Sequence, residues 1–230
     1  NLLFVFRGGA DDVRNPKPIT LGDAAAITDP FQAPEVAAVA PALQGSGQVT
    51  YGGEVANTTI LGATPEYAVV RNDRVAEGDY IREEHLLGQA SVVLLGPDVA
   101  EKLFGRTQGL VGETVRIEGQ PFRVLGILES KGGSSFSNED DRVVVPFTTA
   151  QSRLIRRASR DRVDVLFVQA VSAEAVPRAA EEIAQILRSR HRTEIGKDDF
   201  TILTQQDFLS TAQTITGVLT IFLGGIAGIS

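Results

Sequence analysis

The sequence predicts an α+β fold, in which a strand–helix–strand layer is built from both ends of the chain and a β-rich subdomain is inserted into it. An apolar run, a capped helical segment and a second apolar run follow one another at the start of the chain, and the same order recurs in its last third. Between them, short apolar segments alternate with glycine-containing turns, which is typical of antiparallel β-structure. A length of 230 residues suffices for one large domain or two small ones.

The amino-terminal unit begins with an apolar strand that we expect at Leu2–Phe6. Thr20 is predicted to cap a short helix, and Asp23 stands at the third helical position, where a carboxylate can bond back to the cap. A second strand is expected at Glu35–Ala40. We expect Pro41 to end this strand, because proline has no N–H to donate to a neighbouring strand.

The middle of the chain predicts a series of strands. Two of them are joined by Gly119-Gln120, which is the spacing of a β-hairpin. Alternation of apolar and polar residues in this pair suits a ribbon with one buried face. The strands expected in this region are Gln48–Tyr51, Val55–Leu61, Ala90–Leu95, Thr114–Glu118, Phe122–Leu128 and Val143–Val145.

Two short helices are expected among these strands. One opens at Gly96-Pro97-Asp98 and runs to Phe104, because proline is favoured in the first turn and Gly105 stands just past the end. The other is expected to be capped by Thr148 or Thr149. A polar stretch rich in glycine, serine and acidic residues separates them and is predicted to be a loop.

The last third repeats the order strand, helix, strand. Val163–Val171 is predicted to be a strand, and Ser172 is predicted to cap a helix over 173–190. The apolar residues of this helix recur with the i, i+3, i+4 spacing of one buried face. Phe200–Leu203 is expected to be the closing strand, and Gln206 is expected to begin a helix that leads into the apolar end of the chain.

That end is apolar and uncharged from Ile215 to Ile229. The run is shorter than the roughly 20 residues that a helix needs to cross a bilayer, but membrane helices tolerate its glycine content. We interpret 213–230 as the start of a transmembrane helix or, alternatively, as a packed C-terminal helix. The first residues of the chain lack the basic and apolar regions of a secretory signal.

The composition excludes several kinds of chemistry. The net charge of −7 makes nucleic-acid binding unfavourable, because an acidic surface repels phosphate. With no cysteine, disulfides, thiolate catalysis and cysteine-ligated metals are excluded. Neither histidine stands at ligand spacing from the other. We interpret His85 as solvated in a polar connection, and His191 as part of a basic helix end that complements the helix dipole.

Three polar clusters were candidates for binding sites. Glu139-Asp140-Asp141 lacks the spaced ligands and the glycine of a calcium loop, so a solvated acidic loop is favoured over a cation site. Gly132-Gly133-Ser134-Ser135, in the same polar loop Lys131–Asp141, lacks the Lys-Ser/Thr ending of a phosphate loop and is interpreted as flexible. An arginine cluster is interpreted as a solvated helix face, with an acidic partner or anionic lipid headgroups as the alternative. It comprises Arg153, Arg156, Arg157, Arg160 and Arg162.

Short motifs stand in a fixed order along nearly the whole chain. They are Ile60–Tyr67, Ala76–Ile81, Val93–Gly105, Leu110–Leu128, Asp140–Pro146, Leu187–His191 and Asp199-Phe200. Each motif is weak alone, but their order and spacing together are specific. In this order they resemble the MacB-like periplasmic core domain of FtsX-like ABC permeases.

The resemblance implies a place for the chain in a larger protein. In that family the domain lies between the first and second transmembrane helices of a four-helix permease, on the periplasmic or extracellular side of the inner (cytoplasmic) membrane. The expected division is a membrane-proximal α+β subdomain over 1–45 and 160–212, an inserted β-rich subdomain over 46–159, and the start of a membrane helix over 213–230.

The resemblance also implies a non-catalytic function. Movement driven by a cytoplasmic ABC ATPase, fused or separate, is passed through the membrane helices to this domain, which acts on an adaptor, a lipoprotein or an exported cargo. The full-length permease is expected to form a dimer. The family's domain has no catalytic residues to carry over, so we expect no catalytic, cofactor-binding or metal-ligating residue here.

Two other classes of function remain open. One is a soluble periplasmic binding or structural module unrelated to transport, which would fold residues 215–229 against its own body. The other is an enzyme, for instance a hydrolase that uses carboxylates. The sequence that follows Ser230 in the parent gene would separate the first from a permease, and two carboxylates converging in an enclosed pocket would indicate the second.

Overall fold

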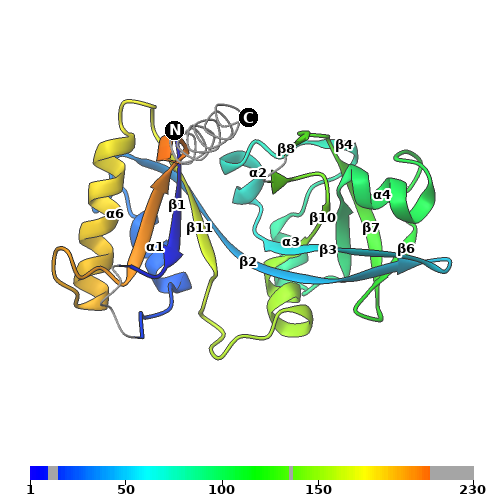
Figure 1. Ribbon diagram of the computed structural model, residues 1–230, viewed down its shortest axis with the longest axis horizontal. Helices are drawn as coiled ribbons and strands as arrows, with labels where there is room; N and C mark the ends of the chain where they lie inside the picture. The colour runs from blue at the N-terminus through cyan, green and yellow to red at the C-terminus, as the bar shows by residue number, and fades with distance from the viewer. Residues whose placement is uncertain (10–14, 135–136, 208–230) are drawn as a thin grey trace, which may run out of the picture.

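Two lobes make up the molecule (Figure 1). The computed structural model describes residues 1–9, 15–134 and 137–207. The first lobe contains both ends of the described chain, and the second contains its middle. One backbone ladder runs through both lobes, because ten strands form a single sheet. This arrangement confirms the α+β fold with inserted strands that the sequence predicts.

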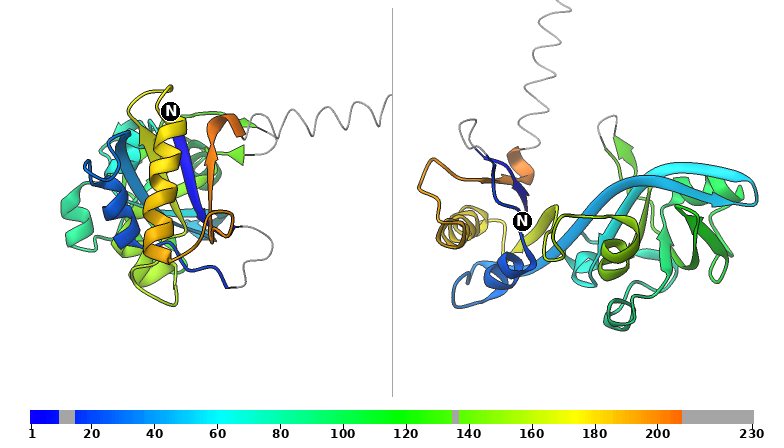
Figure 2. Two further views of the ribbon diagram at one scale, coloured as in Figure 1. Left: turned by 90° about the vertical axis from the view of Figure 1, so that its left-hand side faces the viewer. Right: turned by 90° about the horizontal axis from the view of Figure 1, so that it is seen from below.

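The first lobe is an antiparallel sheet with helices on one face. Its elements are β1 (Leu2–Arg7), α1 (Leu21–Thr28), β2 (Val36–Tyr51), β11 (Val165–Ala170), α6 (Val176–His191) and β12 (Phe200–Thr204). The strands lie in the order β12-β1-β11-β2, and α1 and α6 pack side by side against the sheet (Figure 2). In chain order these are two β-α-β units whose strands interleave, which is the split arrangement of ferredoxin-like folds.

The second lobe is inserted between β2 and β11. Its strands are β3 (Glu54–Ala63), β4 (Val75–Gly78), β5 (Val92–Leu95), β6 (Thr114–Ile117), β7 (Gln120–Leu128) and β10 (Arg142–Pro146), with a small hairpin of β8 (Gly133–Ser134) and β9 (Ser137–Asn138). Its helices are α2 (Glu66–Val70), α3 (Glu83–Leu87), α4 (Pro97–Phe104), α5 (Phe147–Thr149) and the π-helical turn η1 (Ala150–Leu154). The path β2-β3-β10-β5-β7 returns to β2 through β6, so these strands close into a ring.

Both lobes share β2, a strand of 16 residues. Its first half pairs with β11 and its second half pairs with β3, both antiparallel. The sequence predicted two separate strands here, Glu35–Ala40 and Gln48–Tyr51, with a stop at Pro41. That prediction is wrong, because the strand continues through the proline.

Pro41 is tolerated because of the edge that its nitrogen faces. The carbonyl of Ala42 accepts a hydrogen bond from the Asp164 N–H at 3.0 Å, so the backbone of Ala42 faces β11. Successive residues of a strand present their backbone groups to opposite edges. The nitrogen of Pro41 therefore faces the other edge, where pairing with β3 begins only at Ala42. The missing N–H removes no hydrogen bond from the ladder.

Buried apolar side chains form a core that extends through both lobes. In the first lobe, Leu3 of β1 and Leu187 of α6 are fully buried. In the second lobe, Phe122 of β7 and Leu103 of α4 belong to the same cluster. The apolar stripe predicted for α6 is confirmed, because its members face the sheet of the first lobe.

The helix expected after residue 147 differs from its prediction. Helical structure begins at Phe147, directly after β10, and neither Thr148 nor Thr149 is its cap. Their hydroxyl groups donate instead to the carbonyl oxygens of Leu86 (2.6 Å) and Ala90 (2.9 Å). The two threonines therefore tie α5 to the segment around α3, a contact between distant residues that capping patterns do not predict.

Other predicted boundaries are confirmed or shift by a few residues. The helix predicted for Pro97–Phe104 has those bounds. The hairpin turn is Glu118-Gly119, one residue earlier than expected, with φ angles of 49° and 78°. The helix expected from residue 173 begins at Val176, because the Ser172 hydroxyl accepts a bond from the Ala175 N–H in a turn that precedes it.

The expected helix after β12 lies mostly outside the described residues, as does the segment 213–230. Thr204 and Asp207 exchange hydrogen bonds of 2.7 and 3.2 Å in the pattern of a capping box. Among the described residues, none of the helices combines the length and the apolar character that crossing a membrane requires. The subdomain boundaries at 45/46 and 159/160 stay a prediction.

Replacing Thr20 by alanine is expected to lower the free energy of unfolding by about 1 kcal/mol. The predicted capping box is present, and the Thr20 hydroxyl accepts the Asp23 N–H at 3.2 Å. Urea unfolding of the purified chain measures the change. Thr20→Ser keeps the acceptor and should stay within about 0.5 kcal/mol of the unchanged chain. Equal losses in both variants would show that the cap contributes nothing.

Candidate functional site

A cluster of charged side chains lies where the two lobes meet, on the sheet face opposite α1 and α6. Asp73 is its buried centre, 5% exposed. Arg142 Nη2 donates to Asp73 Oδ1 at 2.6 Å, and Lys131 forms an ion pair with the same oxygen. We call the following side chains the charged cluster: Arg71, Asp73, Lys131, Glu139 and Arg142.

Local structure brings these residues together from separate segments. Arg71 ends α2, and Asn72 adopts a positive φ of 48°, which turns the chain sharply. The Asp73 N–H then donates to the Ala68 carbonyl at 2.8 Å and fixes the turn. Arg142 opens β10, which is held between β3 and β5. The cluster therefore rests on the ladder of the second lobe.

Arg71 connects the second lobe to aromatic side chains of the first. Its guanidinium carbon lies 5.6 Å from the ring centre of Phe4 and 5.4 Å from that of Phe167, within the range of cation–π attraction. The Phe167 ring also meets Phe4 and Tyr67 edge-on, with centroids 5.6 and 5.0 Å apart. Because Arg71 forms an ion pair with Glu139 as well, it bridges β1 and β11 to the loop before β10.

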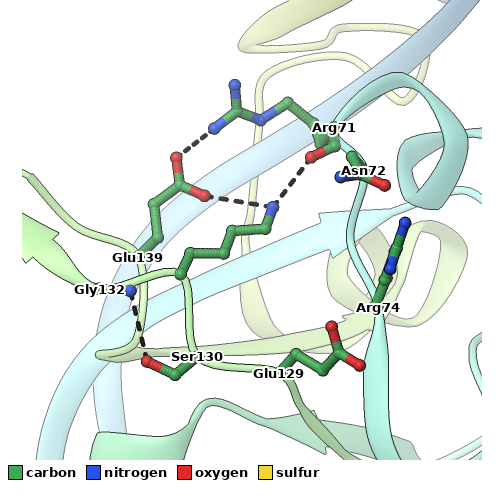
Figure 3. Close-up of a pocket in the computed structure, with 8 residues that line it drawn as sticks. Arg71, Asn72, Arg74, Glu129, Ser130, Gly132 and Glu139 are labelled. Carbon is green, nitrogen blue, oxygen red and sulfur yellow. Dashed lines mark hydrogen bonds and ion pairs between the residues drawn. The ribbon is translucent and has the colours of Figure 1, made fainter.

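A cavity of about 640 Å³ opens beside the charged cluster (Figure 3). Lys131 lines it, and its Nζ donates to the Arg71 carbonyl at 2.9 Å and lies 3.4 Å from the Glu139 carboxylate. Sites for organic ligands are mostly apolar, whereas this wall is charged and polar. It is lined by Arg71, Asn72, Arg74, Glu129, Ser130, Lys131, Gly132 and Glu139. The arrangement suits exchange of ion pairs better than enclosure of a small molecule.

Charge pairing keeps Glu139 ionised. Burial opposes ionisation of Glu139, but the three cations of the charged cluster outweigh it and hold the pKa of this carboxyl below its ordinary value. Burial raises the pKa of the Tyr67 phenol and, with the charge of Asp73, that of the Tyr80 phenol. Both tyrosines are therefore neutral hydrogen-bonding groups: Tyr67 accepts from Arg142 at 2.9 Å.

The acidic run that was expected to be solvated is built into this site. Glu139 belongs to the charged cluster, Asp140 is 6% exposed, and Asp141 is half-buried. The Asp140 carboxylate accepts the backbone N–H groups of Lys131 (2.8 Å) and Gly132 (3.2 Å). Burial opposes its ionisation, yet its hydrogen bonds keep the pKa below the ordinary value. The prediction of a solvated loop is wrong because Glu139 pairs with Arg71, 68 residues away, and Asp140 binds backbone N–H groups at the start of its own loop.

The neighbouring glycine-serine stretch is not simply a flexible loop. Gly133–Ser134 forms β8 and pairs antiparallel with β9. Ser135 lies outside the described residues. The N–H of Gly132 binds Asp140, so this amide of the stretch holds a carboxylate of the chain itself.

The arginine cluster does not form one helix face. Helical structure ends at Leu154, so Arg156 and the arginines after it follow the helix. Arg157 forms a two-bond pair with Asp164, at 2.9 and 2.6 Å. Arg153 donates to the Ser91 hydroxyl. The expected single helix face is therefore wrong, although Arg153, Arg156 and Arg160 are exposed as expected. An acidic or lipid partner for these arginines stays a prediction.

His191 is held inside the first lobe. Its side chain is 5% exposed, with Nδ1 2.7 Å from Asp199 and Nε2 3.3 Å from Asp23. Burial opposes the ionisation of Asp23, but bonds from Arg190, Thr20 and His191 keep its pKa below the ordinary value. His191 therefore has a structural role, as predicted. It joins α6 to α1 and to the start of β12 rather than merely facing the helix dipole.

His85 was expected to be solvated, and this is wrong. It is half-buried in α3, and its Nδ1 accepts the Arg82 N–H at 3.0 Å, which caps that helix. Among the described residues, no three His, Asp or Glu side chains gather as metal ligands. That the domain carries no catalytic, cofactor-binding or metal-ligating residue stays a prediction.

The lobe arrangement is shared with extracytoplasmic domains of ABC-type transporters. The extracellular domain of the transporter YknZ from Gram-positive bacteria matches with a TM-score of 0.71 and 23% identity, covering 89% of this chain and 100% of that one. The periplasmic region of MacB from Actinobacillus actinomycetemcomitans matches with a TM-score of 0.73 and 20% identity, covering 93% and 92%. At these identities the likeness shows the fold.

Comparison of sequences identifies the family of the chain. The model of the MacB-like periplasmic core domain matches residues 1–186, and the chain belongs to this family of ABC-transporter permease domains. The macrolide export ATP-binding/permease protein MacB of Bdellovibrio bacteriovorus is 30% identical over 214 residues, 92% of this chain and 32% of that protein. The pyoverdine export ATP-binding/permease protein PvdT of Pseudomonas savastanoi is 31% identical over 232 residues, 100% and 34%. The chain spans about a third of the length of these relatives.

Replacing Asp73 by asparagine is expected to lower the free energy of unfolding by about 3 kcal/mol, because Arg142, 9% exposed, would lose its nearest counter-ion and keep only Glu139, 3.8 Å away. Urea unfolding measures the loss. Asp79→Asn is the control, since the Asp79–Arg82 pair is 64% and 61% exposed and should contribute less than about 1 kcal/mol. Similar losses in the two variants would contradict a central role for Asp73.

Proposed function

We propose that this chain is the coupling domain of an ABC exporter, held outside the cytoplasm by a parent protein in the cytoplasmic membrane. The match to the MacB-like periplasmic core domain over residues 1–186 carries the proposal. The relatives are named ATP-binding/permease proteins, which supports association with an ABC ATPase, fused or separate. In this role the domain is non-catalytic: it passes movement from the membrane helices to a partner outside.

The geometry offers a route for that movement. β1 and β12 are neighbours in the sheet, and Leu3 pairs with Thr204. In the proposed permease one membrane helix precedes β1 and the next follows β12, so a shift of either helix reaches this pair of strands. From β1 the path continues through Phe4 to Arg71, and from Arg71 to Glu139 in the second lobe.

The second lobe is the proposed site of contact with an adaptor, a lipoprotein or an exported cargo. It lies away from both ends of the described chain, so it reaches farthest from the proposed membrane attachment (Figure 1). We also propose that two copies of the full-length permease form a dimer. A movement that changes the angle between the lobes would then move the two partner surfaces relative to each other.

Cross-linking and pull-down of the full-length parent from native membranes test the proposed function. A reactive probe on the second lobe is expected to recover an ABC ATPase, as a separate subunit or as a domain of the same polypeptide. A soluble parent without an ATPase would favour a periplasmic binding or structural module unrelated to transport. Attachment of a labelled substrate to one of two neighbouring carboxylates would instead favour an enzyme.

Arg71→Gln in the full-length parent is expected to reduce partner-stimulated ATP hydrolysis by about fivefold or more while basal hydrolysis stays unchanged, because only the link between the lobes is lost. Arg74→Gln is the matched control: it lines the same cavity as an exposed side chain. Both variants should stay folded at the assay temperature, with Arg71→Gln unfolding at the lower temperature because it loses its ion pair and its ring contacts. Equal stimulation in Arg71→Gln and Arg74→Gln would exclude Arg71 from the coupling route.

A further inference from the structure

Two loops of the first lobe carry exposed apolar side chains. In the loop between α1 and β2, Phe31 is 95% exposed, and in the loop between β11 and α6, Val171 is 52% exposed. Pro30 and Pro34 flank Phe31 and are exposed as well. We call Pro30, Phe31, Pro34 and Val171 the apolar tip.

Hydrogen bonds hold the two loops side by side. The Val171 N–H donates to the Glu35 carbonyl at 3.0 Å, which places the β11–α6 loop against the α1–β2 loop. The Glu35 carboxylate forms an ion pair with Arg178 of α6 at 2.8 Å. The Glu35 N–H donates to Glu182 of the same helix at 3.1 Å. The two loops are therefore adjacent.

Phe31 stands on a fixed turn. The Asp29 carboxylate accepts the Phe31 N–H at 3.0 Å and the Gln32 side-chain amide at 2.9 Å. The Asp29 carbonyl accepts the N–H groups of Gln32 and Ala33, and Ala33 is buried. Single exposed apolar residues are ordinary on proteins. An aromatic side chain on an ordered turn, beside other apolar groups, has less conformational freedom to lose when it makes a contact.

The apolar tip lies at the end of the lobe where the described chain begins and ends. The Ala170 N–H donates to the Asn1 carbonyl at 2.9 Å, and the Asn1 side-chain amide donates to the Ala170 carbonyl at 2.7 Å. Val171 is the next residue along the chain. Thr204, the last residue of β12, pairs with Leu3 at the same end (Figure 1).

We propose that the apolar tip inserts into the interfacial region of the lipid bilayer, between headgroups and acyl chains. This inference rests on the proposed function, which puts one membrane helix before Asn1 and another after β12. The two loops, 29–35 and 171–175, contain no lysine or arginine, and their charged residues are Asp29, Glu35 and Glu174. Insertion therefore depends on burial of apolar surface rather than on attraction to anionic lipid.

The test uses the full-length parent in nanodiscs of phosphatidylcholine. The chain has no cysteine, so Phe31→Cys can carry a single polarity-sensitive fluorophore once any cysteine elsewhere in the parent is replaced. Ile195→Cys is the matched control: Ile195 is 84% exposed, in the same lobe, in the loop at the opposite end of α6. Emission at Phe31→Cys is expected to shift to the blue and to be quenched by brominated acyl chains. Emission at Ile195→Cys should do neither.

Three results would overturn the inference. Water-like, unquenched emission at Phe31→Cys would show that the tip stays in solvent. A blue shift without quenching by brominated lipid would show that a protein surface covers it. Quenching only in discs with anionic lipid would show electrostatic rather than apolar attachment. If any of these results is found for a parent with which an ABC ATPase is still recovered, the proposed function stands and only the membrane insertion is excluded. A soluble parent would contradict both the proposed function and the membrane insertion.

Discussion

The hydrogen-bond ladder along β2 is the constraint on which both lobes depend. Its first half holds β11 and its second half holds β3, with β6 joining near its far end. No flexible linker separates the lobes at this point, because one strand passes through both. A change of angle between them must twist β2 itself or slide the side chains packed across it. The charged cluster lies against this shared strand, and its ion pairs are the contacts that such a twist would break or remake.

Ion pairs suit this position better than apolar packing would. A buried pair adds little net stability, because desolvation consumes much of the attraction, but its geometry is specific. Arg71 joins both kinds of contact: aromatic faces from the first lobe and a carboxylate from the second. The contact of Arg71 with the aromatic faces tolerates small sideways shifts. Its ion pair with the carboxylate depends on the relative orientation of the two groups. An arrangement of this kind can hold one orientation of the lobes while leaving a second within reach.

Local signals in the sequence predicted local structure well. The bounds of α4 and the capping box at Thr20 follow from neighbouring residues, and both are confirmed. Pro41 could not be interpreted in this way, because its effect depends on which edge of the strand has a partner at that residue. Glu139 was assigned to solvent because its partner Arg71 stands 68 residues away. Helices α2 and α3, of five residues each, are too short to show a period. The motifs and their order along the chain predicted the family, but they did not predict the charged cluster.

The pairing of β1 has a consequence for how the chain acquires its structure. β1 finds its neighbours only in β11 and β12, near the other end of the described chain, whereas β2 and β3 meet across a short turn. Contacts between distant segments form slowly, because a long loop must close first. When such a chain is synthesised and translocated from its amino end, the strands of the inserted lobe are all available before β11 and β12 emerge. Until then β1 has no partner strands, and Leu3 and Val5 are uncovered. The layer nearest the start of the chain is the last to be finished.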